Sequence, residues 1–87
     1  MRILKELKIH DFKVTVFFWN DKYLLKFENG AYELTYKIKQ LDLSSEKDLD
    51  TFFIDERVLE KTKEAFLRME EATEAFFASI WFAPNLP

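Results

Sequence analysis

The stretch YLLKFENGAYELTYKI, Tyr23–Ile38, decides the fold of this 87-residue chain. Apolar and polar residues alternate on both sides of Asn29-Gly30, and Asn-Gly is the strongest two-residue signal for a β-hairpin. These two residues suit a type I′ turn, which needs positive φ at both central positions. Pairing outward from this turn sets Phe27 opposite Tyr32. The same register pairs Leu25 with Leu34, and Tyr23 with Tyr36.

Two further turn signals extend the hairpin into a sheet. Asn20-Asp21 lies upstream, and His10-Asp11 is a third and weaker signal. The registers that follow from these turns place the same apolar residues on the same face, whereas a slip of one residue would reverse the faces. The sequence therefore predicts a four-stranded antiparallel meander, with strands at about 2–9, 12–19, 22–28 and 31–41.

One face of the predicted sheet is apolar and should be buried. It comprises Ile3, Leu7, Ile9, Phe12, Val14, Val16, Phe18, Tyr23, Leu25, Phe27, Tyr32, Leu34, Tyr36 and Ile38. Lys5 is a misfit on this face, near an edge where its ammonium group can reach solvent. The other face is polar and rich in lysine, and it carries one apolar cluster.

The apolar cluster of the polar face consists of Phe17, Trp19 and Leu24. In one interpretation it is covered by the tail, by a second subunit or by lysine stems, and the pairs Lys26–Glu33 and Lys13–Glu28 are ordinary surface pairs. In the other, bases of a single-stranded nucleic acid stack on the aromatic rings and lysines contact the phosphates. This predicted face contains no arginine, which weakens the second interpretation, since arginine is the usual residue for such contacts. The candidate binding residues are Lys13, Phe17, Trp19, Lys22, Leu24, Lys26 and Lys37.

The second half of the chain is predicted to be helical, over about 45–83. Ser45 is a candidate N-cap for a short helix over about 46–53, and Asp55 can cap a long helix over about 56–82, which Pro84 ends. A helix of this length spans about 40 Å, whereas four strands side by side are only about 15–20 Å wide. The long helix should therefore extend beyond its own sheet.

The faces of the long helix change along its length. Up to Glu74 it has one apolar stripe and one charged side, but the residues after Glu74 read AFFASIWFA and are apolar on all sides. A helix that is apolar all round is normally buried all round. A homodimer formed through this helix follows, unless the helix bends back near Ala72–Thr73 in a compact monomer. The candidate interface residues are Met69, Ala72, Phe76, Phe77, Ile80 and Trp81.

The sequence carries no motif for catalysis or for a cofactor. It contains no cysteine and a single histidine, His10, which is placed in a turn. The acidic run between Asp42 and Asp55 lacks the glycine and the spacing of a calcium loop, so helix capping explains it better. We therefore expect a single domain that is not an enzyme and that binds neither a metal nor a cofactor.

Charge and hydropathy limit the location and the partners. The net charge of −3 divides unevenly, because residues 1–41 carry +3 and residues 42–87 carry −6. This argues against a general polyanion binder, although one face can still be basic. The C-terminal apolar run of about nine residues is too short to span a bilayer, which needs about twenty. The N-terminus lacks the apolar core of a signal peptide. We therefore expect a cytoplasmic protein without a membrane partner.

The element order resembles that of the single-stranded-DNA-binding transcriptional regulators, a superfamily that includes the Whirly proteins and the positive-cofactor coactivators. The resemblance lies in four strands followed by an overhanging helix. It is carried by KVTVFFWNDKYLLKFENGAYELTYKI (Lys13–Ile38) and DERVLEKTKEAFLRMEEATEAFFASIWF (Asp55–Phe82). It implies a β4α unit that dimerises through its helix and binds nucleic acid across its strands. The chain also looks like small bacterial proteins without an assigned function.

Together these features predict an α+β fold of the ββββα type and a homodimeric binding module. Its first expected ligand is single-stranded nucleic acid on the strand face. The alternative is a dimeric protein-interaction or scaffold module, in which the Phe17, Trp19 and Leu24 cluster docks another protein.

Overall fold

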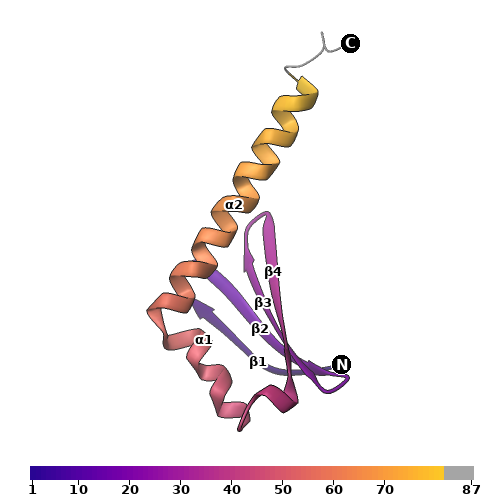
Figure 1. Cartoon of the computed structure of the whole chain (residues 1–87), viewed down its shortest axis with the longest axis vertical. Helices are drawn as coiled ribbons and strands as arrows, with labels where there is room; N and C mark the ends of the chain where they lie inside the picture. Colours follow the sequence, from indigo (N-terminus) through magenta and orange to yellow (C-terminus); the bar gives the residue numbers. More distant parts are fainter. Residues whose placement is uncertain (82–87) are drawn as a thin grey trace.

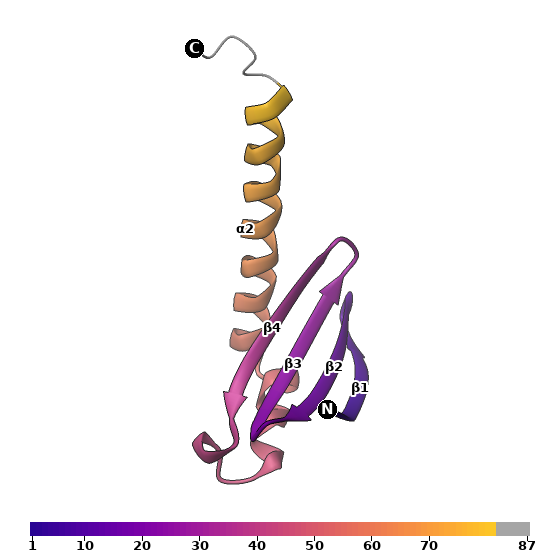
Figure 2. The ribbon, with the colours of Figure 1, turned by 90° about the vertical axis from the view of Figure 1, so that its right-hand side faces the viewer.

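The computed structural model describes residues 1–81 and confirms the α+β prediction. A single antiparallel sheet has the strand order β1-β2-β3-β4, and helices lie against one of its faces (Figures 1 and 2). The strands are β1 (Arg2–Ile9), β2 (Phe12–Trp19), β3 (Lys22–Asn29) and β4 (Tyr32–Lys39). The helices are η1 (Gln40–Asp42) and η2 (Glu46–Asp50), both 3₁₀, and α1 (Thr51–Ile54) and α2 (Glu56–Trp81). The predicted final helical position, 82, lies outside the described residues.

The third turn corrects the predicted register of β3 and β4. The structure pairs Asn29 with Tyr32, so the two turn residues are Gly30 and Ala31. Of these two residues, only Gly30 has a positive φ, 61°, as in a type II′ turn. Glycine suits the second position of a type I′ turn and the first position of a type II′ turn, so the local signal does not separate the two. The observed register adds a ladder pair, and the apolar residues stay on the predicted face.

A β-bulge in β1 corrects the position of Ile3. The pairing with β2 shifts between Ile3 and Lys5, so that Leu4 is the extra residue. Leu4 packs against the core, whereas Ile3 pairs with Phe17 on the opposite face and is 57% exposed. Lys5 stays on the core side at the edge, where its Nζ lies 3.3 Å from the Oδ1 of Asp50. The prediction that Ile3 is buried was therefore wrong.

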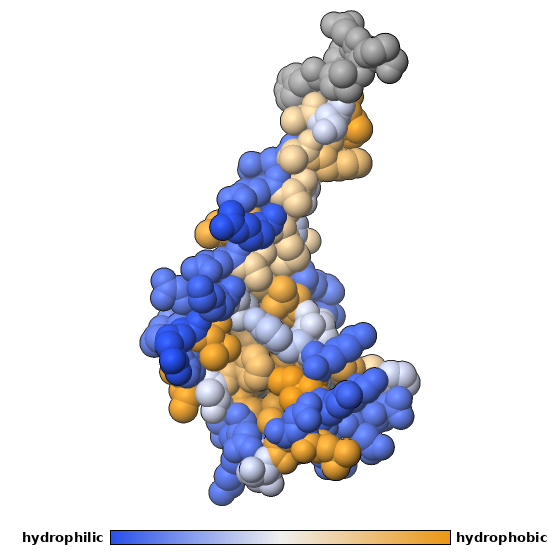
Figure 3. All heavy atoms as spheres, in the orientation of Figure 1, coloured by the Kyte–Doolittle hydropathy of each residue, from blue (hydrophilic) through white to orange (hydrophobic). Residues whose placement is uncertain are grey.

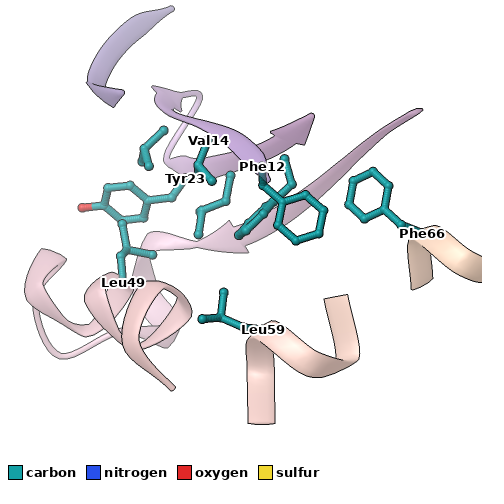
Figure 4. Close-up of a cluster of buried hydrophobic side chains, with 9 residues drawn as sticks. Phe12, Val14, Tyr23, Leu49, Leu59 and Phe66 are labelled. Carbon is teal, nitrogen blue, oxygen red and sulfur yellow. The ribbon is translucent and has the colours of Figure 1, made fainter. Parts of the chain in front are cut away.

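The core joins the central strands to three helical residues (Figure 4). Leu49 of η2 and Leu59 and Phe66 of α2 are each no more than 5% exposed. The ring of Phe66 packs on that of Phe12, with 4.9 Å between the centroids. The strand residues of this cluster are Phe12, Val14, Val16, Tyr23, Leu25 and Phe27. They belong to the predicted apolar face, so the choice of the buried face is confirmed.

The helix starts follow the predicted caps. The hydroxyl of Ser45 accepts a hydrogen bond from Lys47 N, and the Asp48 carboxylate accepts one from Ser45 N. The Asp55 Oδ1 accepts a hydrogen bond from Arg57 N at 2.9 Å, which caps α2. The predicted short helix over 46–53 is instead split into η2 and α1, which reaches Ile54.

Helix α2 extends well beyond the sheet, as the sequence predicts (Figures 1 and 2). The described chain measures 56 × 27 × 20 Å along its principal axes, and the helix accounts for this elongation. Residues 70–81, which we call the overhang, are exposed except for Thr73, which is partly buried. The helix is continuous through Ala72 and Thr73, so the bend of a compact monomer is absent.

Candidate functional site

The face of the sheet that the helices leave uncovered, here called the outer face, gathers the predicted binding residues into rows. In one row Ile3, Phe17, Leu24 and Lys37 lie side by side on four strands. The neighbouring row contains Trp19, Lys22 and Lys39. Together these two rows form one end of the outer face, which we call the basic end. Strand pairing thus brings aromatic, aliphatic and lysine side chains from distant positions onto one surface.

Two lysines of the basic end lie directly opposite each other. Lys22 of β3 pairs with Lys39 of β4, an arrangement of like charges that destabilises a sheet. Among residues 1–81, the ion pairs shorter than 4.0 Å do not include Lys22, Lys37 or Lys39. The two rows of the basic end themselves contain no carboxylate. This concentration of positive charge would be stabilised by an anion.

The opposite end of the outer face is electrically balanced. Here Glu28 pairs with Glu33, and the Nζ of Lys26 lies 3.8 Å from Glu28 and 3.7 Å from Glu33. Glu28 also pairs with Lys13 of β2, and Lys13 in turn pairs with Lys8 of β1. Lys13 and Lys26 were predicted to contact phosphate, but the structure places both beside carboxylates. Lys26 lies in the row next to the basic end, and Lys13 lies one row further away.

Lys39 belongs to the basic end, although the sequence did not single it out as a candidate. The reason is the shifted register, which sets Lys39 opposite Lys22, whereas the predicted register sets Lys37 there. The whole outer face carries six lysines and three glutamates, which give it a net charge of +3. These residues are Lys8, Lys13, Lys22, Lys26, Lys37, Lys39, Glu6, Glu28 and Glu33.

The apolar side chains of the basic end are available to a ligand. Trp19 is 52% exposed, while Phe17 and Leu24 are half-buried among the long side chains around them. Beside the helices, by contrast, three hollows open on the inner side of the sheet or at its ends, and Trp19 and Phe17 line none of these three. The exposure of Trp19 makes the basic end an accessible surface, which suits an extended ligand better than a small enclosed one.

Side chains that could bind a metal ion are not clustered in the described part of the chain. Among residues 1–81, no three His, Cys, Asp or Glu side chains come together in a way that could hold a metal ion. Asp55 is the carboxyl group whose environment is most clearly perturbed: its hydrogen bond with the Arg57 side chain lowers its pKa below the usual 3.8. This effect belongs to the cap of α2. The expectation that the chain is not an enzyme stays a prediction.

The predicted interface residues lie on α2, away from the basic end. Met69 is half-buried against the core, and Ala72 is exposed. In the overhang, the rings of Phe77 and Trp81 stack, with 4.6 Å between centroids. The large apolar side chains of the overhang are exposed by 58% at Phe76, 36% at Phe77, 54% at Ile80 and 63% at Trp81. They therefore form an apolar surface that residues 1–81 leave uncovered.

Comparison with known proteins adds no assignment. Within residues 1–81 we find no helix with the length and apolar character needed to cross a membrane. No protein-family model, curated protein or solved structure matches the chain.

Proposed function

We propose that the chain is a non-enzymatic, homodimeric binding module that holds single-stranded nucleic acid on the basic end of its outer face. The observation that carries the proposal is the pairing of Lys22 with Lys39 beside Trp19. This row places two cations and an aromatic ring next to each other on an open surface. Sheets that bind single strands use this combination of stacking and phosphate contact.

Each part of the basic end has a role in this proposal. The exposed ring of Trp19 offers a stacking surface for a base, and Phe17 in the next row offers a second one. Lys22, Lys37 and Lys39 lie on one side of these rings, on β3 and β4, and contact the phosphates. Stacking accepts any base, so the module should bind with little sequence preference.

The acidic net charge of the chain is compatible with this ligand because the charges are separated in space. The outer face carries +3, so the rest of the chain carries −6 to give the total of −3. The helices lie against the inner face, on the other side of the sheet (Figure 2). A phosphate backbone that approaches the outer face therefore meets positive charge first.

A labelled oligonucleotide tests the proposal. The anisotropy of a fluorescein-labelled thymidine 15-mer is measured against protein concentration at several salt concentrations, with a duplex of equal length as the control ligand. Three phosphate contacts on a single strand predict a slope of about −2 in log K against log salt, or a fall in affinity of about 18-fold between 50 and 200 mM. Absence of binding at 50 mM salt, or equal binding of the duplex, would overturn the proposal.

Substitution of Trp19 tests the stacking contact. Trp19→Ala should weaken binding of the oligonucleotide by about 5- to 150-fold, since one stacked base contributes about 1–3 kcal/mol. Leu41→Ala is the control, because Leu41 lies just after β4 and is 95% exposed. An equal loss in the two variants would show that Trp19 does not stack on a base.

The alternative is a protein-interaction or scaffold module that uses the same surface. It is favoured by the β-bulge, which adds the exposed Ile3 to Phe17, Trp19 and Leu24 and so enlarges the apolar part of the outer face. A protein partner would be retained after nuclease treatment, lost with Trp19→Ala and unaffected by Lys39→Ala. Loss of the partner on nuclease treatment would exclude this alternative.

A further inference from the structure

The apolar stripe that attaches α2 to its own sheet continues unchanged into the overhang. Phe77 lies eighteen residues after Leu59, and Ile80 lies eighteen residues after Thr62. Eighteen residues make five turns of an α-helix, so each pair points in the same direction. Leu59 and Thr62 are buried against the sheet, whereas Phe77 and Ile80 are not. The overhang thus presents a surface of the kind that packs on a sheet, at a place where the described part of its own chain provides no sheet.

The inner face of the sheet is, in turn, incompletely covered along β4. Its four inner side chains, Tyr32, Leu34, Tyr36 and Ile38, are only half-buried. Beside them, Tyr36, Phe52 and Val58 line an open hollow between β4 and the start of α2. Figure 3 shows apolar side chains between α2 and the sheet, and this apolar surface continues along α2. One chain therefore exposes both an unpartnered apolar helix end and an open apolar sheet face.

We propose that a second copy of the chain covers both surfaces. The two copies form a twofold dimer in which their α2 helices run antiparallel and cross near Met69–Ala72. The overhang of each helix lies on the inner face of the partner's sheet, beside the start of the partner's α2. This arrangement specifies the homodimer of the proposed function, and it does not depend on nucleic-acid binding.

The length of the overhang fits this arrangement. Its twelve residues, 70–81, extend for about 18 Å, and four strands are about 15–20 Å wide. The overhang can thus cross one sheet. A twofold axis buries the same two surfaces in both copies and leaves no overhang free for a third chain, so the assembly is closed.

The side chains at the crossing fit in an antiparallel register. Ala65, Met69, Ala72 and Phe76 follow at intervals of four, three and four residues, so they share one side of α2. An axis between residues 70 and 71 sets Ala65 opposite the partner copy's position 76, and Met69 opposite its position 72. Each contact then joins a large side chain to an alanine, which lets two helices approach closely while leaving little empty space.

The charges of α2 favour the antiparallel direction. Residues 56–68 carry four basic and three acidic side chains, a net charge of +1. Residues 69–81 carry three glutamates and no basic residue, a net charge of −3. In the proposed register, Glu74 lies level with position 67 of the partner copy and thus beside the basic half of its helix, while Glu70 and Glu71 lie at the crossing on sides of α2 that point away from the contact. Parallel helices would instead set all three glutamates of one copy level with those of the other.

The buried area reaches the size of a stable interface. The overhang exposes 58% of Phe76, 36% of Phe77, 54% of Ile80 and 63% of Trp81. Full burial of these four side chains removes about 400 Å² per copy, given about 200 Å² for each large side chain. The surface they cover contributes a similar area, so the two overhangs bury about 1,600 Å² in total, the standard size of a specific interface.

Sedimentation equilibrium of a matched pair of variants tests the interface. Ile80→Glu places a charge on the apolar stripe, and Ala78→Glu places the same charge on the opposite side of the same turn. Both positions are exposed in a single chain, so neither change should prevent folding. At 20 µM and without nucleic acid, we expect wild type and Ala78→Glu at twice the mass of one chain, and Ile80→Glu at the mass of one chain. A monomeric wild type, or the same mass for both variants, would overturn the inference.

Disulfide formation between two different variants tests the direction of the helices, because the chain has no cysteine of its own. The proposed register sets Lys61 of one copy level with the partner copy's position 80, while two copies of either residue lie about 28 Å apart along the helix. A mixture of Lys61→Cys chains and tagged Ile80→Cys chains should therefore give mixed dimers on oxidation. Glu60→Cys points away and should not react with Ile80→Cys. Preferential oxidation of Ile80→Cys with itself would indicate parallel helices and contradict the proposal.

Discussion

The hydrogen bond between β4 and α2 gives a sharp test of how the helix is attached to the sheet. The hydroxyl oxygens of Tyr36 and Thr62 lie 2.6 Å apart, and Thr62 is completely buried. The Thr62 hydroxyl also donates to the Val58 carbonyl at 2.9 Å. Since one hydroxyl has a single hydrogen, Tyr36 must donate to Thr62. Thr62→Val keeps the shape of the side chain and removes the acceptor of this bond.

The expected loss follows from the groups left without a partner. In Thr62→Val, the Val58 carbonyl keeps its helical hydrogen bond, but the half-buried Tyr36 hydroxyl loses its acceptor. We expect a decrease of about 1–2 kcal/mol in the free energy of unfolding, and about 1 kcal/mol for Tyr36→Phe. The double variant should lose clearly less than the sum, because removal of both partners leaves no unsatisfied group.

Urea unfolding followed by circular dichroism measures these changes in wild type, both single variants and the double variant. All four proteins are compared at one concentration, because the proposed dimer would make stability depend on concentration. We expect a coupling of about 1 kcal/mol between the two positions. A coupling below about 0.3 kcal/mol would show that this bond does not hold α2 on the sheet.

Three further predictions concern the core, a turn and a helix cap. Phe66→Ala removes the ring that packs on Phe12 and should lower the free energy of unfolding by about 3–5 kcal/mol, whereas a loss below 1 kcal/mol in urea would contradict the described core. Gly30→Ala meets open space, so its cost of about 1–2 kcal/mol should come only from the positive φ; an unchanged urea midpoint would contradict the turn. The hydrogen bond from the Arg57 side chain lowers the pKa of Asp55, so this carboxylate stabilises the fold above its usual pKa of 3.8, and the contribution is lost as the pH falls through the lowered value. The difference in melting temperature between wild type and Asp55→Asn should therefore shrink from pH 6 to pH 3, and a constant difference would argue against the cap.

The faces of the sheet could be predicted from the sequence because apolar and polar residues alternate over most of each strand, and because each two-residue turn determines which residues of the paired strands share a face. The pairing within the third hairpin could not be predicted in the same way. When the whole turn moves by one residue, each residue of β3 changes its partner on β4 by two positions, and the faces of both strands stay the same. The side chain of Ile3 was misplaced for a related reason. A β-bulge shifts the alternation by one residue, and nothing in the local sequence of β1 marks Leu4 as the extra one.

The composition of the candidate site depended on these details of pairing. Phe17, Trp19 and Leu24 were grouped correctly by alternation and the Asn20-Asp21 turn. Which lysines accompany them depends on the register of β4, and the observed register brings Lys39 into the site. Ion pairs of long side chains also form with diagonal neighbours. Lys26, for example, contacts Glu28 and Glu33, and neither is its direct partner across the strands.

The overhang of α2 was predictable because it follows from two lengths, that of the helix and the width of the sheet. The open inner face along β4 was not, because periodicity shows which side chains point inward but not how far a helix covers them. This is why the predicted core residues Leu34, Tyr36 and Ile38 are only half-buried in one chain.

The most direct test of nucleic-acid binding at the basic end compares two charge reversals on the outer face. Lys37→Glu changes the basic end, and Lys8→Glu makes the same change in the balanced row that contains Glu28 and Glu33. The affinity for the labelled thymidine 15-mer is measured at 50 mM salt for both variants and for wild type. We predict a loss of at least tenfold for Lys37→Glu and less than threefold for Lys8→Glu. Equal losses in the two variants, or a larger loss for Lys8→Glu, would contradict a binding site at the basic end.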